Sequence, residues 1–121
     1  MSGWVGRRNG RGCGGNHQPW AKVFERLSQR RGDDGHVRVV AAAMRESLED
    51  FRPEWVVYDA GVDVTSNDTL GHLDLTVEGL YRRERMVMDT VLGAGIPLAG
   101  VVGGGYSPDI DELASRHAVL H

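Results

Sequence analysis

The sequence predicts a small α/β domain with parallel strands, and three observations lead to this fold class. Two short apolar runs, at residues 55–58 and 96–102, are typical of strands buried in a parallel sheet. An amphipathic helical pattern that ends near Leu92 separates the two runs. Together they form a βαβ unit, whose crossover should be right-handed and whose strands should be parallel. Because two strands make a thin sheet, we expect part of a larger α/β domain or a subunit that needs a partner chain.

A first helix is predicted before this unit. Apolar residues recur at intervals close to 3.6 over residues 37–51, and the charged residues lie elsewhere on the helical wheel. Asp33 or Asp34 is the expected N-cap, because a short carboxylate side chain accepts hydrogen bonds from the first amides of a helix. Pro53 restricts the residue before it to extended conformations, so the helix should end there.

The other two helices also have recognisable boundaries. Thr76 is the expected N-cap of the central helix, and Gly93 or Gly95 should end it. Ser107 is the expected N-cap of a last helix, with Pro108 at its first position and three acidic residues in its first turn. The predicted order is therefore helix, strand, helix, strand, helix.

Length and composition exclude several classes of protein. The 121 residues, of which 40% are hydrophobic, allow at most one small domain. Cys13 is the only cysteine, which excludes an internal disulfide and a multi-cysteine zinc site within one chain. No apolar run approaches the roughly 18 residues of a transmembrane helix, and no signal-peptide pattern opens the sequence. We therefore expect an intracellular protein without a membrane partner, in either cytoplasm or nucleus.

The first 31 residues differ in charge from the rest. They carry seven Arg or Lys and one Glu, a net charge of +6, whereas the remaining residues carry −9. Six of the first fifteen residues are glycine, so we expect an irregular, disordered segment over residues 1–19 and a short helix over residues 20–30. This basic arm is either a solvated tail, an RNA-binding segment or an artefact of gene prediction joined to a domain that begins near Gly32.

Two loops follow the predicted strands and hold the residues best suited to chemistry. Residues 59–75 contain four Asp, which are plausible ligands for a divalent metal, although Asp also favours turns for purely local reasons. Residues 103–106 read GGGY. Such glycines allow a close backbone approach or positive φ angles, and a phosphate cradle is a weaker alternative. The hydroxyl of Tyr106 is suited either to stabilise a developing oxyanion or to packing.

Several linked motifs carry a resemblance to a known family. The segments VVYDAGVDVTSNDTLGHLDLTVEGLYRRERMV and IPLAGVVGGGYSPDIDELASRHAVLH resemble the C-terminal portion of histone deacetylase-like proteins, in particular the class IV and bacterial-type members of the zinc-dependent arginase/deacetylase superfamily. The resemblance covers roughly residues 32–121 and not residues 1–31. It implies the C-terminal βαβα part of a three-layer, parallel-sheet arginase/deacetylase fold.

The resemblance also implies a chemistry, the hydrolysis of an acyl group from lysine or a similar amine. Asp63 matches the family's second aspartate ligand of Zn²⁺, and Tyr106 matches the tyrosine that polarises the acyl carbonyl. Gly104 and Gly105 match glycines that line the acyl tunnel, and Leu70 resembles a tunnel-wall position. The substrate would be an acylated lysine or an acetylated amine.

This sequence departs from the family at its other catalytic positions. The family's D-x-H zinc ligands and tandem histidines lie upstream, and nothing in these 121 residues supplies them. A catalytic zinc site uses three protein ligands, so we expect little or no deacetylase activity from this chain alone. Two other functions stay open. One is a non-catalytic module that pairs with a partner chain, or aggregates, through open strand edges; the other is an RNA-associated protein that uses the basic arm.

Overall fold

The computed structural model describes residues 3–6, 32–66 and 73–121, and for residues 3–6 it describes the backbone. The order of elements is β1 (Gly3–Gly6), α2 (Gly32–Phe51), β2 (Trp55–Ala60), α3 (Val77–Gly93), β3 (Leu98–Val102), α4 (Ile110–His117) and a short 3₁₀ turn, η1 (Ala118–Leu120). The helix expected over residues 20–30 lies outside the described residues. From residue 32 onward, the predicted alternation of helices and strands is confirmed.

The described strands form one mixed sheet with β2 at its centre. β2 and β3 are parallel, with Val56 opposite Leu98 and Ala60 opposite Val102, as the βαβ pattern predicts. On the other edge β1 pairs with β2 in antiparallel fashion. The irregular structure expected over residues 1–19 is therefore wrong for Gly3–Gly6. Its two glycines give no local strand signal, and the strand is defined by pairing with distant β2.

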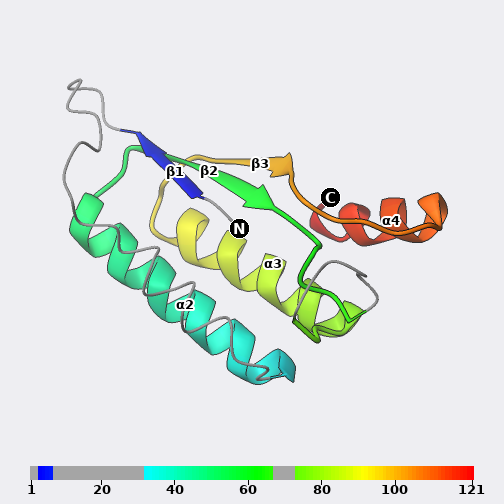
Figure 1. Cartoon of the computed structure of the whole chain (residues 1–121). Helices are drawn as coiled ribbons and strands as arrows, with labels where there is room; N and C mark the ends of the chain where they lie inside the picture. Colours follow the sequence, from blue (N-terminus) through cyan, green and yellow to red (C-terminus); the bar gives the residue numbers. More distant parts are fainter. Residues whose placement is uncertain (1–2, 7–31, 67–72) are drawn as a thin grey trace, which may run out of the picture.

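Helices α2 and α3 lie side by side against one face of the sheet (Figure 1). The core beneath them contains Val40 from α2, Tyr58 and Ala60 from β2, and Val87 from α3. A second cluster lies beyond the end of β2 and consists of Val62, Val64, Leu75 and Leu80, with Leu73, Leu113 and Val119 packed on it. This second cluster joins the loop after β2 to both α3 and the C-terminal segment.

The start of α2 differs from the prediction. The helix begins at Gly32, so Asp33 lies in its first turn instead of capping it. The Asp33 carboxylate accepts hydrogen bonds from the Thr76 amide at 3.0 Å and the Thr76 hydroxyl at 2.5 Å. Thr76 in turn caps α3, as predicted, by accepting from the Gly79 amide at 3.0 Å. Asp33 therefore joins the beginnings of two helices, a contact 43 residues apart that no local pattern reveals.

The other helix ends are largely as expected. Helix α2 ends at Phe51, two residues before Pro53. Helix α3 ends at Gly93, and Gly95 adopts a φ of +74° just beyond it. The predicted cap of α4 is wrong, because Asp109 takes that position in place of Ser107.

Strand β3 is exposed, which corrects the expectation of a second buried strand. Val101 and Val102 have exposed fractions of 43% and 66%, whereas alternate residues of β2 are buried. The reason is position, since β3 is the outer strand of the described sheet and α2 and α3 pack beneath β2. Within the described ranges no helix is long and apolar enough to cross a membrane.

Candidate functional site

The loops that follow β2 and β3 meet at the carboxyl end of the sheet. Because the two strands are parallel and in register up to Ala60 and Val102, their loops leave the same edge. The Val62 amide then donates a hydrogen bond to the Gly104 carbonyl at 2.6 Å. The two loops singled out in the sequence are thus in direct contact, at the position where parallel sheets usually bind ligands.

Glycine is required where these loops touch. A Cβ atom on Gly103 would lie 1.8 Å from Asp59 Oδ1 and 2.7 Å from the Gly61 amide nitrogen. Gly105 adopts a φ of +153°, and a Cβ there would lie 2.5 Å from Val62 Cγ2. The close backbone approach and the positive φ angle expected of this glycine run are both present. In the described structure the approach is between two loops of the same chain.

Asp63 lies at this contact. Its Oδ1 is 3.1 Å from where a Cβ on Gly61 would be, and its Oδ2 is 3.0 Å from where a Cβ on Gly104 would be. The side chain is exposed to solvent at the edge of the sheet. Tyr106 follows two residues after Gly104 and is 52% exposed. The fold therefore brings the Asp63 and Tyr106 loops together, while Leu70 lies outside the described residues.

A buried ion pair supports the first loop from below. Arg83, fully buried on α3, donates from Nη2 to the Gly61 carbonyl at 2.8 Å. Its Nε also donates to Glu84 Oε1 at 3.1 Å, and Glu84 is buried as well. Arg82 and Arg83 lie in the segment that carries the family resemblance, but the sequence predicts no role for Arg83. The sequence does contain one indication that Arg83 is buried. Its spacing of three and four residues from the core residues Leu80 and Val87 places it on the same face of the helix.

The groups around this ion pair are held neutral. Burial, with a smaller contribution from the charge of Arg83, lowers the pKa of His36 on α2 to about 4. Burial raises the pKa of Tyr58 on β2 well above its ordinary value. A neutral imidazole and a neutral phenol therefore line the interior behind the loop at neutral pH.

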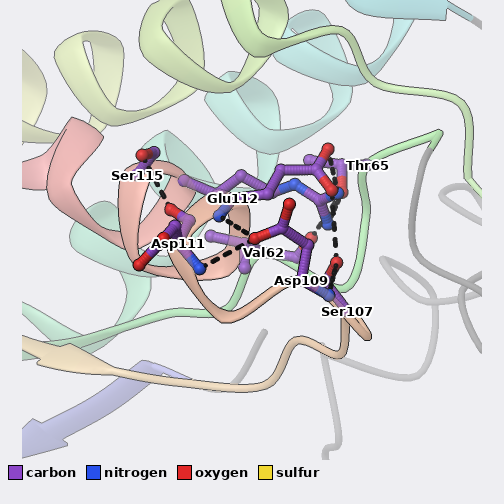
Figure 2. A network of polar contacts seen from close by, with 8 residues as sticks. Val62, Thr65, Ser107, Asp109, Asp111, Glu112 and Ser115 are labelled. Atoms are coloured by element: carbon purple, nitrogen blue, oxygen red, sulfur yellow. Dashed lines mark hydrogen bonds and ion pairs between the residues drawn. The ribbon is translucent and has the colours of Figure 1, made fainter.

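A polar network ties the two loops together at the base of α4 (Figure 2). Arg116 is buried, and its Nη1 donates to the Thr65 hydroxyl at 3.2 Å. Its Nη2 lies 2.7 Å from Glu112 Oε1. The Ser107 hydroxyl donates to Glu112 Oε2 at 3.2 Å. The sequence predicts Ser107 as a cap and Glu112 as one of the acidic residues in the first turn of the helix, but it predicts no role for Arg116 or Thr65, because their contact spans 51 positions.

The histone deacetylase domain family matches residues 6–121 of this chain. The chain belongs to the histone deacetylase family. This family match includes residues 6–31, so the expectation that this segment lies outside the family is wrong there, while the division of the chain near residue 31 stays a prediction.

Individual relatives agree with this assignment. An uncharacterized protein from Picosynechococcus sp. is 48% identical over 95 residues, which cover 78% of this chain and 32% of the relative. Histone deacetylase 2 from Arabidopsis thaliana is 33% identical over 73 residues, covering 60% of this chain and 19% of that protein. Histone deacetylase clr6 from Schizosaccharomyces pombe is 31% identical over 75 residues, covering 62% and 18%. The chain spans about a third or less of the length of these curated relatives.

Zinc is the metal expected for a histone deacetylase, but the described residues do not fit a complete zinc site. Across residues 32–66 and 73–121 there is no group of three or more His, Cys, Asp or Glu side chains placed to hold a metal ion. A catalytic zinc needs three protein ligands.

Proposed function

We propose that this chain supplies the C-terminal part of a zinc-dependent deacetylase site, which removes an acyl group from acylated lysine or an acetylated amine. Asp63 would contribute one ligand to Zn²⁺, and Tyr106 would act on the acyl carbonyl. The remaining ligands and the proton-transferring histidines would come from outside the described residues. The chain by itself should therefore show little or no deacetylase activity.

The observation that carries this proposal is the contact between the two loops. The 2.6 Å hydrogen bond from Val62 to Gly104 joins the Y-x-A-G-x-D motif to the G-G-G-Y motif across the sheet edge. The two motifs are about 40 residues apart in sequence, and the parallel pairing of β2 with β3 brings them to the same edge of the sheet. Their contact, with Asp63 against Gly104 and Tyr106 two residues further on, supports a common site.

Each proposed residue has a role that follows from its chemistry. The phenol of Tyr106, half exposed and attached to the glycine loop, is suited to donate a hydrogen bond to a developing oxyanion. Gly104 and Gly105 would line the acyl channel with backbone, because their Cβ positions point toward Asp63 and Val62 of the neighbouring loop. Leu70 would form part of the wall of the same channel.

The decisive experiment is a chimera that completes the domain. The aligned segment of the Picosynechococcus protein, 95 residues long, is replaced by the corresponding residues of this chain. Zinc-dependent hydrolysis is measured on acetyl-lysine peptides and acetylated polyamines, with the parent protein as reference. Tyr106→Phe should lower kcat by roughly 100- to 1,000-fold, the usual effect of losing an oxyanion donor.

Matched variants control for general damage to the chimera. Tyr81→Phe removes a phenol of similar exposure from α3, 50% against 52% for Tyr106, and should leave the rate unchanged. Asp63→Asn should reduce both activity and zinc content, whereas Asp50→Asn on α2 should reduce neither. Hydrolysis of neither substrate class by the parent and chimera would refute the proposed function. Full activity in folded Tyr106→Phe and Asp63→Asn chimeras would refute the proposed site.

A non-catalytic interaction module is the second candidate, and the exposure of β3 favours it. Val101 and Val102 present an apolar strand at the edge of the described sheet. Such edges pair readily with other strands. Analytical ultracentrifugation across a hundredfold concentration range tests this, because a concentration-independent monomer with cooperative unfolding would contradict it.

A further inference from the structure

We propose that Arg116 is a positioning residue that couples the loop carrying Asp63 to the loop carrying Tyr106. Its importance to catalysis rests on the proposed function, but the coupling itself is a property of this chain and is testable without metal or substrate. The buried guanidinium is the link, since one terminal nitrogen contacts Thr65 of the first loop and the other contacts Glu112 of α4.

One arm of the network holds the Asp63 loop. Arg116 Nη1 donates to the Thr65 hydroxyl at 3.2 Å, and that hydroxyl donates to the Val62 carbonyl at 3.0 Å. The Thr65 amide also donates to the same carbonyl at 3.2 Å. Val62 and Thr65 lie on either side of Asp63 in the sequence, and both are buried. The turn that presents the Asp63 carboxylate is therefore closed by the hydroxyl that Arg116 holds.

The other arm holds the Tyr106 loop. Arg116 Nη2 lies 2.7 Å from Glu112 Oε1, and Glu112 Oε2 accepts from the Ser107 hydroxyl at 3.2 Å. Ser107 directly follows Tyr106 and is buried. Its hydroxyl also accepts from the Asp109 amide at 3.2 Å, which fixes the approach to α4. Both oxygens of one carboxylate thus bridge the guanidinium and the residue next to Tyr106 (Figure 2).

The cost of this arrangement argues for a positioning role. Burying a guanidinium is unfavourable, and well-packed apolar residues often stabilise a fold as well or better. An apolar residue could not form the polar contacts with both Thr65 and Glu112 that connect the two loops. Arginine has a rigid planar guanidinium, so the hydrogen bond from Nη1 to Thr65 also fixes where Nη2 lies in its ion pair with Glu112. The same geometry excludes lysine, whose single ammonium presents no planar fork.

The test is NMR on the full chain. A substitution is made at Thr65, on the Asp63 loop, and the response is measured at and after the Tyr106 loop. Thr65→Val keeps the shape of the side chain and removes the hydroxyl. The ring signals of Tyr106 should shift, and amide hydrogen exchange at Asp111 and Glu112 should accelerate by about tenfold or more, although Thr65 lies on the other loop. Thr65→Ser restores the hydroxyl and should return both measurements to wild-type values.

Two controls make the result specific. The ring signals of Tyr81 serve as an internal reference and should not move. Arg85→Gln breaks the exposed pair between Arg85 and Asp89 on α3 and should change neither loop. Glu112→Met is the reciprocal variant, which removes both acceptor oxygens from a side chain that is 41% exposed, and should accelerate exchange at the Val62 and Thr65 amides.

The coupling is refuted if Thr65→Val affects Val62 and Thr65 alone and leaves Tyr106, Asp111 and Glu112 as in wild type. If Thr65→Val does not fold, Glu112→Met decides, and unchanged exchange at Val62 and Thr65 then refutes the proposal. Neither measurement involves zinc or an acyl substrate. Failure of the coupling would therefore leave the chimera test of function intact, and an inactive chimera would leave the coupling intact.

Discussion

Strands β2 and β3 are parallel neighbours with similar apolar character, yet their environments differ. Val56, Tyr58 and Ala60 of β2 are at most 5% exposed beneath α2 and α3, whereas Val102 of β3 is 66% exposed. Apolar composition therefore predicts that a segment is a strand, and a βαβ pattern predicts its parallel partner. Whether the strand is buried depends on what covers it, which the segment itself does not encode.

The loops at the ends of these strands repeat the contrast. After β2, the Gly61 carbonyl is held from below by the fully buried Arg83 of α3. After β3, Ser107 is held through Glu112 and Arg116 of α4, nearer the surface. The first loop is thus supported by the helix-covered core and, through Thr65, also by Arg116 of α4, whereas the second loop is supported by α4.

The largest effect is expected at Arg83. Arg83→Met leaves Glu84 buried without its cationic partner and removes the hydrogen bond to Gly61, so the free energy of unfolding should fall by about 3–5 kcal/mol. Urea denaturation measures this. Arg85→Met on the exposed face of α3 is the control, with a change within about 0.5 kcal/mol. Equal stability of the two variants would show that the β2 side does not depend on its buried ion pair.

The interior behind β2 should also respond to pH. The pKa of His36 is about 4 in the folded chain against 6.5 when exposed, so below pH 6.5 the unfolded state binds more protons. Stability should fall as pH drops from 6.5 to 4, by up to about 3 kcal/mol from this residue. His36→Phe removes that contribution, and its unfolding free energy should depend less on pH across this window. Parallel curves for the two proteins would contradict the burial of a neutral imidazole.

The strands themselves allow a matched comparison with a smaller effect. Val56→Ala removes two buried methyl groups under the helices and should lower the free energy of unfolding by about 1.5–3 kcal/mol. Val102→Ala removes the same groups from an exposed position and should change it by less than about 0.5 kcal/mol. Thermal and urea unfolding of both variants give the difference. Similar losses would mean that β3 is covered in solution, as in a self-associated form.

Local sequence signals predicted what local chemistry determines. The Thr76 cap of α3 and the need for glycine at 103–105 follow from patterns within a few residues, and the parallel pairing of β2 and β3 follows from the strand–helix–strand order over residues 55–102. The resemblance correctly pointed to the histone deacetylase family, and the parallel strands explain why Asp63 and the glycine loop share one edge.

Features that depend on distant contacts were missed. Strand β1 forms only by pairing with β2, and Asp33 accepts from Thr76 instead of capping its own helix. At α4 two suitable caps, Ser107 and Asp109, lie two positions apart in sequence, and the hydrogen bond between Ser107 and Glu112 belongs to a network that reaches the other loop. Arg116 looks like an ordinary charged helix residue until its contact with Thr65 is known.

The central claim is that Asp63 and Tyr106 belong to one site, and a double-mutant cycle in the chimeric deacetylase tests it most directly. The measurement is kcat/KM for Asp63→Asn, Tyr106→Phe and the double variant. Residues that act on the same reacting group are non-additive, so the double variant should lose far less than the product of the two single losses. A double variant whose loss equals that product would show that the two residues act independently and would contradict the account.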